Sequence, residues 1–204
     1  MKKRREYVAV LAFLAAIIGI SGCSRQKEEK LTKYDTQFFE LFDTVTSVTG
    51  YARDEKTFQS YVDVFYDELK EYHQLYDIYN DYEGINNIKT INDHAGIEPV
   101  GVDDKIIQML EEAVDIYELT DGNMNVAMGS VLSIWHEYRE AGLKHPEQAQ
   151  LPPQEELEEA AKHMDIRKMV IDPEKKTVYL EDPDMSLDVG AIAKGYAAEM
   201  ASRK

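Results

Sequence analysis

Near its C-terminal end the chain carries a segment, SLDVGAIAKGYAAEM (Ser186–Met200), whose residue types can bind an anionic or polar ligand. The pattern predicts a strand that ends at Asp188, a turn at Gly190-Ala191, and a helix from Ile192 onward. A turn of small residues exposes backbone N–H groups at the helix N-terminus, where anions bind. Asp188 can cap the helix or accept hydrogen bonds from a ligand, and Lys194 adds positive charge. Alone, the two residues can equally be a routine cap and a surface lysine.

Other chemistry-bearing residues do not form a known catalytic pattern. We interpret all five histidines as non-catalytic because they show no ligand spacing such as HExxH: His73, His94, His136, His145 and His163. The chain contains no P-loop and no GxGxxG fingerprint, so neither common nucleotide-binding fold is indicated. Trp135 is expected to pack in the core, and Tyr79, one of 13 tyrosines, can belong to the core or its rim.

The composition excludes two broad classes of protein. A hydrophobic fraction of 44% with 10% aromatic residues is enough for a globular core, so the chain is not disordered throughout. The formal net charge is -16, whereas a nucleic-acid-binding surface needs clustered lysine and arginine. We therefore expect no nucleic-acid partner.

The first residues read as a targeting segment rather than as part of the fold. A basic head precedes an apolar run from Tyr7 to Ile20, which is short for a membrane span but fits the core of a signal peptide. The only cysteine, Cys23, follows in ISGC, which resembles the lipobox of bacterial lipoproteins. This resemblance implies a signal peptide over 1–22, lipidation of Cys23 and a polar tether over 23–34. The mature protein would then be lipid-anchored to the cell membrane outside the cytoplasm. An uncleaved N-terminal anchor is the alternative.

The remaining chain alternates between helical and extended patterns. Apolar residues at helical spacing predict helices over 55–79, 103–122 and 154–164, and a helix in the second part of 123–142. Gly122 is expected to stop the second of these helices. Extended patterns predict a strand or hairpin arm over 36–52 and three strands over 168–190, while 80–102 reads as a loop. This mixture predicts an α+β (mixed α/β) fold.

Read together, several segments resemble the ApbE family of FAD:protein FMN transferases. LDVGAIAKGYA is similar to the family signature at nearly every position, and TDGNMNVAMGSVLSIWH resembles a second family segment. FDTVTSVTGYA resembles the opening MGT strand, and YDIYNDYEGINNIKTINDHAG resembles the FSxY segment. The resemblance implies an ApbE-like FAD-binding domain over 35–204. In the family the signature lies near the middle, so we expect this sequence to be the N-terminal portion of a longer protein, with the C-terminal half missing.

The same resemblance implies roles for individual residues. Asp188 and Lys194 match FAD-binding positions, Lys194 also as the cationic clamp of the reaction, and the Ala191 carbonyl matches a Mg²⁺ ligand. The remaining FAD-binding positions are matched by Phe42, Tyr79, Asn123, Met124 and Asn125. The chain departs from the family in two places, since Phe42-Asp43 replaces Met-Gly and Asn125 replaces an aspartate.

The implied activity is Mg²⁺-dependent transfer of FMN from FAD to a threonine or serine of an acceptor flavoprotein. The product is a phosphoester, and AMP leaves. Three alternatives remain open at the level of sequence: hydrolysis of FAD to FMN and AMP, a flavin-carrying lipoprotein without transferase activity, and a solute-binding lipoprotein. The flavin carrier lacks a DGxTGAT-like acceptor motif, and the solute-binding class would show two similar halves.

Overall fold

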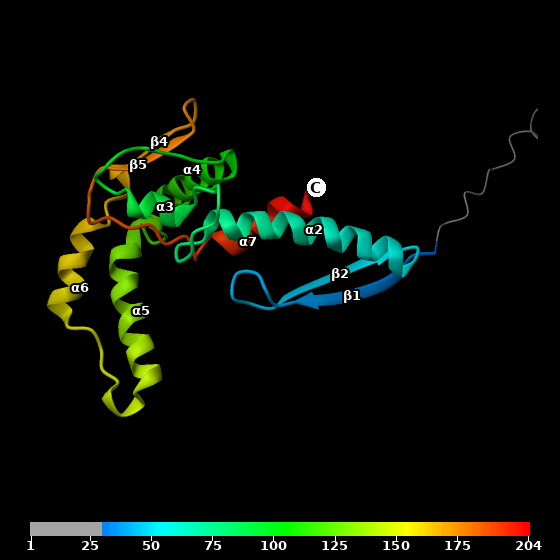
Figure 1. Ribbon diagram of the computed structural model, residues 1–204, viewed down its shortest axis with the longest axis horizontal. Helices are drawn as coiled ribbons and strands as arrows, with labels where there is room; N and C mark the ends of the chain where they lie inside the picture. Colours follow the sequence, from blue (N-terminus) through cyan, green and yellow to red (C-terminus); the bar gives the residue numbers. More distant parts are fainter. Residues whose placement is uncertain (1–29) are drawn as a thin grey trace, which may run out of the picture.

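The computed structural model describes residues 30–204. The predicted signal peptide and Cys23 lie outside the described residues. A long helix with a β-hairpin forms one end of the molecule, and shorter helices with a small sheet form the other (Figure 1). Within residues 30–204 no helix is both long and apolar enough to cross a membrane.

The hairpin consists of β1 (Thr32–Phe38) and β2 (Thr46–Ala52), paired antiparallel from Thr32 opposite Ala52 to Phe38 opposite Thr46. Burial alternates along β2, as expected for a sheet with one covered face. The ring of Tyr34 stacks on Phe58 with centroids 5.5 Å apart, which packs the hairpin against the next helix. The predicted hairpin is confirmed, although β1 begins before residue 36.

Two of the predicted amphipathic helices form the frame of the fold. They are α2 (Glu55–Tyr76) and α4 (Asp104–Leu119), and each follows an aspartate whose side chain accepts a hydrogen bond from the first turn. After α4, Gly122 has a φ of 79°, and its N–H donates to the Tyr117 carbonyl at 2.8 Å. Gly122 thus ends this helix as predicted, because a left-handed backbone suits glycine.

The segment 80–102, expected to be a loop, contains two short elements. These are α3 (Ile88–Asp93) and β3 (Val100–Gly101). A reciprocal capping box between Asn87 and Thr90 starts α3, and the helix buries Ile88 and Ile91. The Asn and Gly residues of this segment favoured a loop prediction. The capping box and the two buried isoleucines stabilise α3 instead.

The end of the molecule that carries the shorter helices also contains a three-stranded antiparallel sheet, with the strand order β3-β5-β4 (Figure 1). The strands β4 (Met169–Asp172) and β5 (Thr177–Leu180) are joined by the predicted turn. The third strand expected in this region does not form, because Ser186–Val189 has no ladder partner.

The remaining helices are α5 (Gly129–Lys144), α6 (Gln154–Ala160) and α7 (Ala193–Ser202), with short 3-10 turns at 126–128, 146–148, 161–163 and 166–168. The helices α5 and α6 lie side by side at one end of the molecule in Figure 1. Trp135 on α5 is 42% exposed, so its expected place in the core is wrong. The pattern of α5 is only weakly one-sided, and Gly129 is its one fully buried residue.

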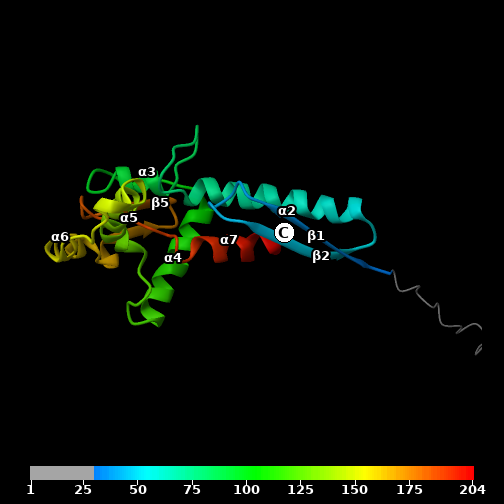
Figure 2. The ribbon, with the colours of Figure 1, turned by 90° about the horizontal axis from the view of Figure 1, so that it is seen from below.

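The core joins residues from α3, α4, the sheet and the signature segment. On α7, every fourth residue is buried, and all three are alanines: Ala193, Ala197 and Ala201. The helix α7 packs along α2, as Figure 2 also shows. Small side chains let the two helices approach closely. The start of α7 is thereby held beside the C-terminal end of α2.

Candidate functional site

The signature segment reaches the site as an irregular strap held by three other parts of the chain. The Gly129 N–H donates to the Ser186 carbonyl at 2.9 Å, and the Asp188 N–H donates to the Val126 carbonyl at 2.8 Å. Leu187 is held on both sides by the Asn92 amide, at 2.7 Å and 3.0 Å. The expected strand ending at Asp188 is therefore wrong: its alternating burial is real, but its backbone bonds are made to loops and a side chain.

Asp188 caps the turn after it rather than helix α7. Its Oδ1 accepts a hydrogen bond from the Gly190 N–H at 2.8 Å. The N-cap of α7 is Ile192, which makes no side-chain capping bond. The first N–H groups of α7 are thus left without a side-chain acceptor beside an exposed turn that contains Ala191.

A cavity of about 380 Å³ lies at this turn and brings together four residues predicted to bind FAD: Phe42, Tyr79, Asp188 and Lys194. Phe42 comes from the β1–β2 turn and Tyr79 from the segment after α2, while the other two flank the start of α7. Residues distant in the sequence therefore meet in one place. Asp43, His73 and Asp77 also line this cavity.

The segment after α2 is held in shape by a buried carboxylate, Asp77. It accepts hydrogen bonds from the Tyr79 N–H at 2.7 Å, the Tyr82 hydroxyl at 2.7 Å, and both the backbone and side chain of Asn80. Burial alone would raise the pKa of Asp77, but these donors, led by the Asn80 side chain, lower it. Burial and the bond to Asp77 raise the pKa of Tyr82 to about 12. Asp77 therefore stays charged and fixes the wall that carries Tyr79.

Tyr79 separates this cavity from a second hollow of about 180 Å³, and both are lined by Ile78, Tyr79 and Asp188. Its ring lies over His136 of α5 with centroids 5.5 Å apart and planes at 33°. Tyr79 is 57% exposed, and burial of its hydroxyl together with nearby Asp188 raises its pKa. A half-exposed aromatic ring between two hollows can stack on a planar ligand.

The Asn123-Met124-Asn125 turn lines neither of these two hollows. The Asn123 amide donates to the Thr120 carbonyl, and Met124 packs on the core. Asn125 accepts from the Ala127 N–H at 2.8 Å and donates to the Met164 carbonyl at 2.9 Å. An aspartate at position 125 would lack that donor. Val126, which follows this turn, accepts the hydrogen bond from the Asp188 N–H. The predicted flavin contacts of the turn stay predictions.

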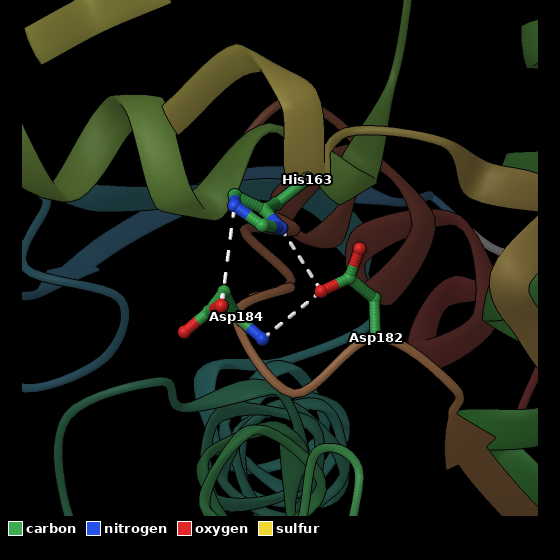
Figure 3. Close-up of side chains that lie close together, drawn as sticks. All are labelled: His163, Asp182 and Asp184. Atoms are coloured by element: carbon green, nitrogen blue, oxygen red, sulfur yellow. Dashed lines mark hydrogen bonds and ion pairs between the residues drawn. The ribbon is translucent and has the colours of Figure 1, made fainter. Parts of the chain in front are cut away.

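One side-chain group within the described residues has a composition that can hold a metal: His163, Asp182 and Asp184 (Figure 3). Its buried member, Asp182, already accepts from His163 Nδ1 at 2.9 Å, Lys168 Nζ at 2.7 Å and the Asp184 N–H at 3.1 Å. None of the three lines the cavity at Asp188. We therefore describe this group as a structural clamp between the 161–168 turns and the segment after β5.

The predicted magnesium ligand, the Ala191 carbonyl, lies in an exposed turn. Magnesium prefers nearly octahedral oxygen coordination. No group of three His, Cys, Asp or Glu side chains of residues 30–204 gathers there, so these residues do not by themselves fit a complete magnesium site.

The sequence reasoning missed His73, Asp77 and His136, which are part of the site's walls. The two histidines lie on helices, where the amphipathic pattern marks them only as surface positions. Asp77 lies within the segment that carries Tyr79. The predicted helix over 55–79 ran through Asp77, whereas α2 ends at Tyr76 and Asp77 is its C-cap.

Comparison with known proteins shows what the whole chain is similar to. A protein from Chlamydia pneumoniae named FAD:protein FMN transferase is 21% identical over 183 residues, covering 89% of this chain and 53% of the relative. Its namesake in Vibrio cholerae is 25% identical over 190 residues, covering 93% and 53%. The chain thus spans about half the length of these curated relatives.

Solved structures show the same fold. The crystal structure of an ApbE protein from Thermotoga maritima matches with a TM-score of 0.68 and 25% identity, over 84% of this chain and 52% of that one. The flavin transferase ApbE from Vibrio cholerae matches with a TM-score of 0.66 over 85% and 53%; at 19% identity this similarity shows the fold alone. The expected mixed α/β, ApbE-like fold is confirmed. Residues 42–204 also match the sequence profile of the ApbE family, and the chain therefore belongs to the ApbE family.

Proposed function

We propose that this chain is the FAD-binding portion of an FAD:protein FMN transferase. The observation that carries the proposal is the meeting of Phe42, Tyr79, Asp188 and Lys194 around one cavity of about 380 Å³. These residues come from three separate family segments, yet the fold brings them together. The names of the relatives support the transferase activity.

The reaction is the transfer of a phosphoryl-linked flavin. The hydroxyl oxygen of an acceptor threonine or serine attacks the FMN-side phosphorus of FAD and forms a phosphoester. The bond from that phosphorus to the bridging oxygen breaks, AMP leaves with this oxygen, and the hydroxyl proton is lost to solvent. Catalysis of such a step is largely positioning and stabilisation of negative charge.

The described residues can supply two of these contributions. Lys194, exposed at the first turn of α7, provides a flexible positive charge for the pyrophosphate at a helix N-terminus that no side chain caps. The rings of Phe42 and Tyr79 offer stacking surfaces for the isoalloxazine or adenine. Asp188 accepts hydrogen bonds from the ligand.

Magnesium dependence is part of the proposal as an expectation. The ion would neutralise charge on the pyrophosphate, and the Ala191 carbonyl would contribute one oxygen. Since the described residues do not complete its coordination, we route no step of the reaction through it.

The transferase proposal is tested by comparing variants of the full-length protein that contains this chain. Lys194→Ala should lower transfer of fluorescent flavin to an acceptor protein by about 10²-fold or more, because charge stabilisation at transferred phosphates is worth several kcal/mol. Lys144→Ala is the matched control, since Lys144 lies at the end of α5 and lines neither hollow. In-gel flavin fluorescence and AMP release are the measurements. Equal activity of the two variants would refute the role of Lys194.

The same assay separates the alternatives. AMP release without acceptor labelling would identify FAD hydrolysis. FAD binding with no AMP release would identify a flavin-binding lipoprotein that does not transfer FMN. Labelling that requires a threonine or serine of the acceptor supports the transferase and the proposed acceptor flavoproteins as partners.

A further inference from the structure

The turn between β1 and β2 has an unfavourable backbone. Phe42 and Asp43 have φ values of 55° and 50°, and neither is glycine. The Thr44 N–H donates to the Leu41 carbonyl at 3.3 Å and closes the turn around them. Residues with a Cβ are disfavoured in this left-handed region because the Cβ approaches the following carbonyl oxygen. Other contacts must therefore hold the turn in place.

Besides packing against the core, Phe42 contacts His73 of α2. The Phe42 N–H donates to His73 Nδ1 at 3.2 Å, and the Phe42 ring packs edge-on against the imidazole at 5.3 Å. Since Nδ1 accepts this bond, it carries no proton.

The other side of the imidazole is also engaged. His73 Nε2 lies 3.5 Å from the Tyr82 hydroxyl, whose own proton goes to Asp77 Oδ2 at 2.7 Å. With Nδ1 as an acceptor, the tautomer that carries its proton on Nε2 can donate to the Tyr82 oxygen. Because both nitrogens face protein groups, His73 has no free nitrogen for proton transfer with a substrate.

This network connects the turn to the rest of the cavity. Phe42, Asp43, His73 and Asp77 all line it together with Asp188 and Lys194. We infer that His73 is a positioning residue, which holds the Phe42–Asp43 turn as a wall of the cavity so that Phe42 is in place for the flavin dinucleotide. The inference rests on the proposed function for the identity of the ligand, while the turn itself can be tested without it.

The experiment uses the full-length protein with His73→Ala, His73→Asn, Asp43→Gly and the double variant His73→Ala/Asp43→Gly. FAD affinity is measured by quenching of flavin fluorescence, and amide hydrogen exchange is measured at Phe42. His73→Ala should weaken FAD binding about tenfold and speed exchange at Phe42, because the amide loses its acceptor. His145→Ala is the control, since His145 is exposed after α5.

Two rescues distinguish positioning from direct contact. The Asn carbonyl can take the place of Nδ1, so His73→Asn should recover most of the affinity. Glycine adopts positive φ freely, so Asp43→Gly should recover part of the affinity in the His73→Ala background. Loss of binding that neither change rescues would assign His73 to the ligand directly and overturn the inference.

Further outcomes separate this inference from the proposed function. Unchanged affinity and unchanged Phe42 exchange in His73→Ala would refute the positioning role. If the unaltered protein does not bind FAD, the proposed function fails, and the exchange at Phe42 alone decides whether His73 holds the turn. If His73→Ala does not fold, by thermal unfolding, the comparison of His73→Asn with the unaltered protein decides the same point.

Discussion

At the scale of single residues, the two carboxylate oxygens of Asp188 differ in their hydrogen bonds. Oδ1 accepts the Gly190 N–H at 2.8 Å, whereas Oδ2 accepts no hydrogen bond from residues 30–204. Asp188 lines the same cavity as Lys194. This arrangement leaves one strong acceptor for a donor group of the ligand.

We therefore expect Asp188→Ala to weaken FAD binding by about 1–3 kcal/mol, because a ligand donor would lose its acceptor. Titration of the full-length protein with FAD checks this. Asp184→Ala serves as the control, because Asp184 is an exposed aspartate nearby that does not line the cavity. Equal affinities of the two variants would contradict the role given to Asp188.

The residues of the site could be predicted where a motif carries them and not where only packing does. Phe42, Tyr79, Asp188 and Lys194 were identified from family segments, and the fold brings them to one cavity. His73 could not be identified in this way. Its importance depends on the φ values of Phe42 and Asp43, which no linear pattern expresses.

At the scale of elements, amphipathic helices were predictable and the strap at 186–189 was not. Periodicity reports which face of an element is buried, and α2 and α4 follow it. Leu187 and Val189 are also buried alternately, so the strap resembles a strand in sequence. Its true partners, Asn92 and Val126, are distant in the chain. Local pattern contains no information about them.

The contact between the strap and α5 gives a prediction about helix glycines. A Cβ at Gly129 would lie 2.5 Å from the Ser186 carbonyl oxygen, whereas a Cβ at Gly195 of α7 would meet nothing within 4 Å. Gly129→Ala should therefore destabilise the protein by about 1–3 kcal/mol, as overpacking does. Gly195→Ala should stabilise it by about 0.5–1 kcal/mol through helix propensity.

Thermal unfolding followed by circular dichroism checks both glycine variants. The pair is matched because each replaces a helical glycine by alanine. A stable Gly129→Ala variant would mean that the strap can move away from α5.

At the scale of the whole molecule, the ion pairs and hydrogen bonds of Asp182 make the free energy of unfolding depend on pH in the acid range. The Lys168 ammonium, with smaller help from the Asp184 N–H and His163, lowers the pKa of Asp182 from 3.8 to about 2 against the opposing effect of burial. The folded state thus binds this proton less readily than the unfolded state. The stabilisation is fully present above about pH 4 and is lost as the pH falls toward about 2.

Asp182→Asn should remove that dependence. We expect a loss on the order of 1 kcal/mol at neutral pH, discounted because Lys168 is 42% exposed, and a shallower fall in melting temperature between pH 4 and pH 2. Melting curves over this range, with Asp184→Asn as the control, provide the measurement. If the melting temperatures of Asp182→Asn and the unaltered protein fall equally between pH 4 and pH 2, Asp182 is not the source of this acid dependence.

The location of the protein is a prediction from the sequence. The ISGC segment predicts lipidation of Cys23, so Cys23→Ala should release the protein from membranes or leave its precursor uncleaved. Membrane fractionation and gel mobility measure the two results. Unchanged fractionation and mobility would refute the proposed anchor.

The strap also sets an order of events during folding. Its bonds to Asn92 and Val126 close long loops, and closing such loops costs chain entropy before any contact repays it. The helices α2 and α4 can form from local contacts, but the cavity exists only once the strap has docked against α3 and the start of α5. Formation of the cavity is consequently a late event, and a ligand of this cavity can bind only after the core is nearly native.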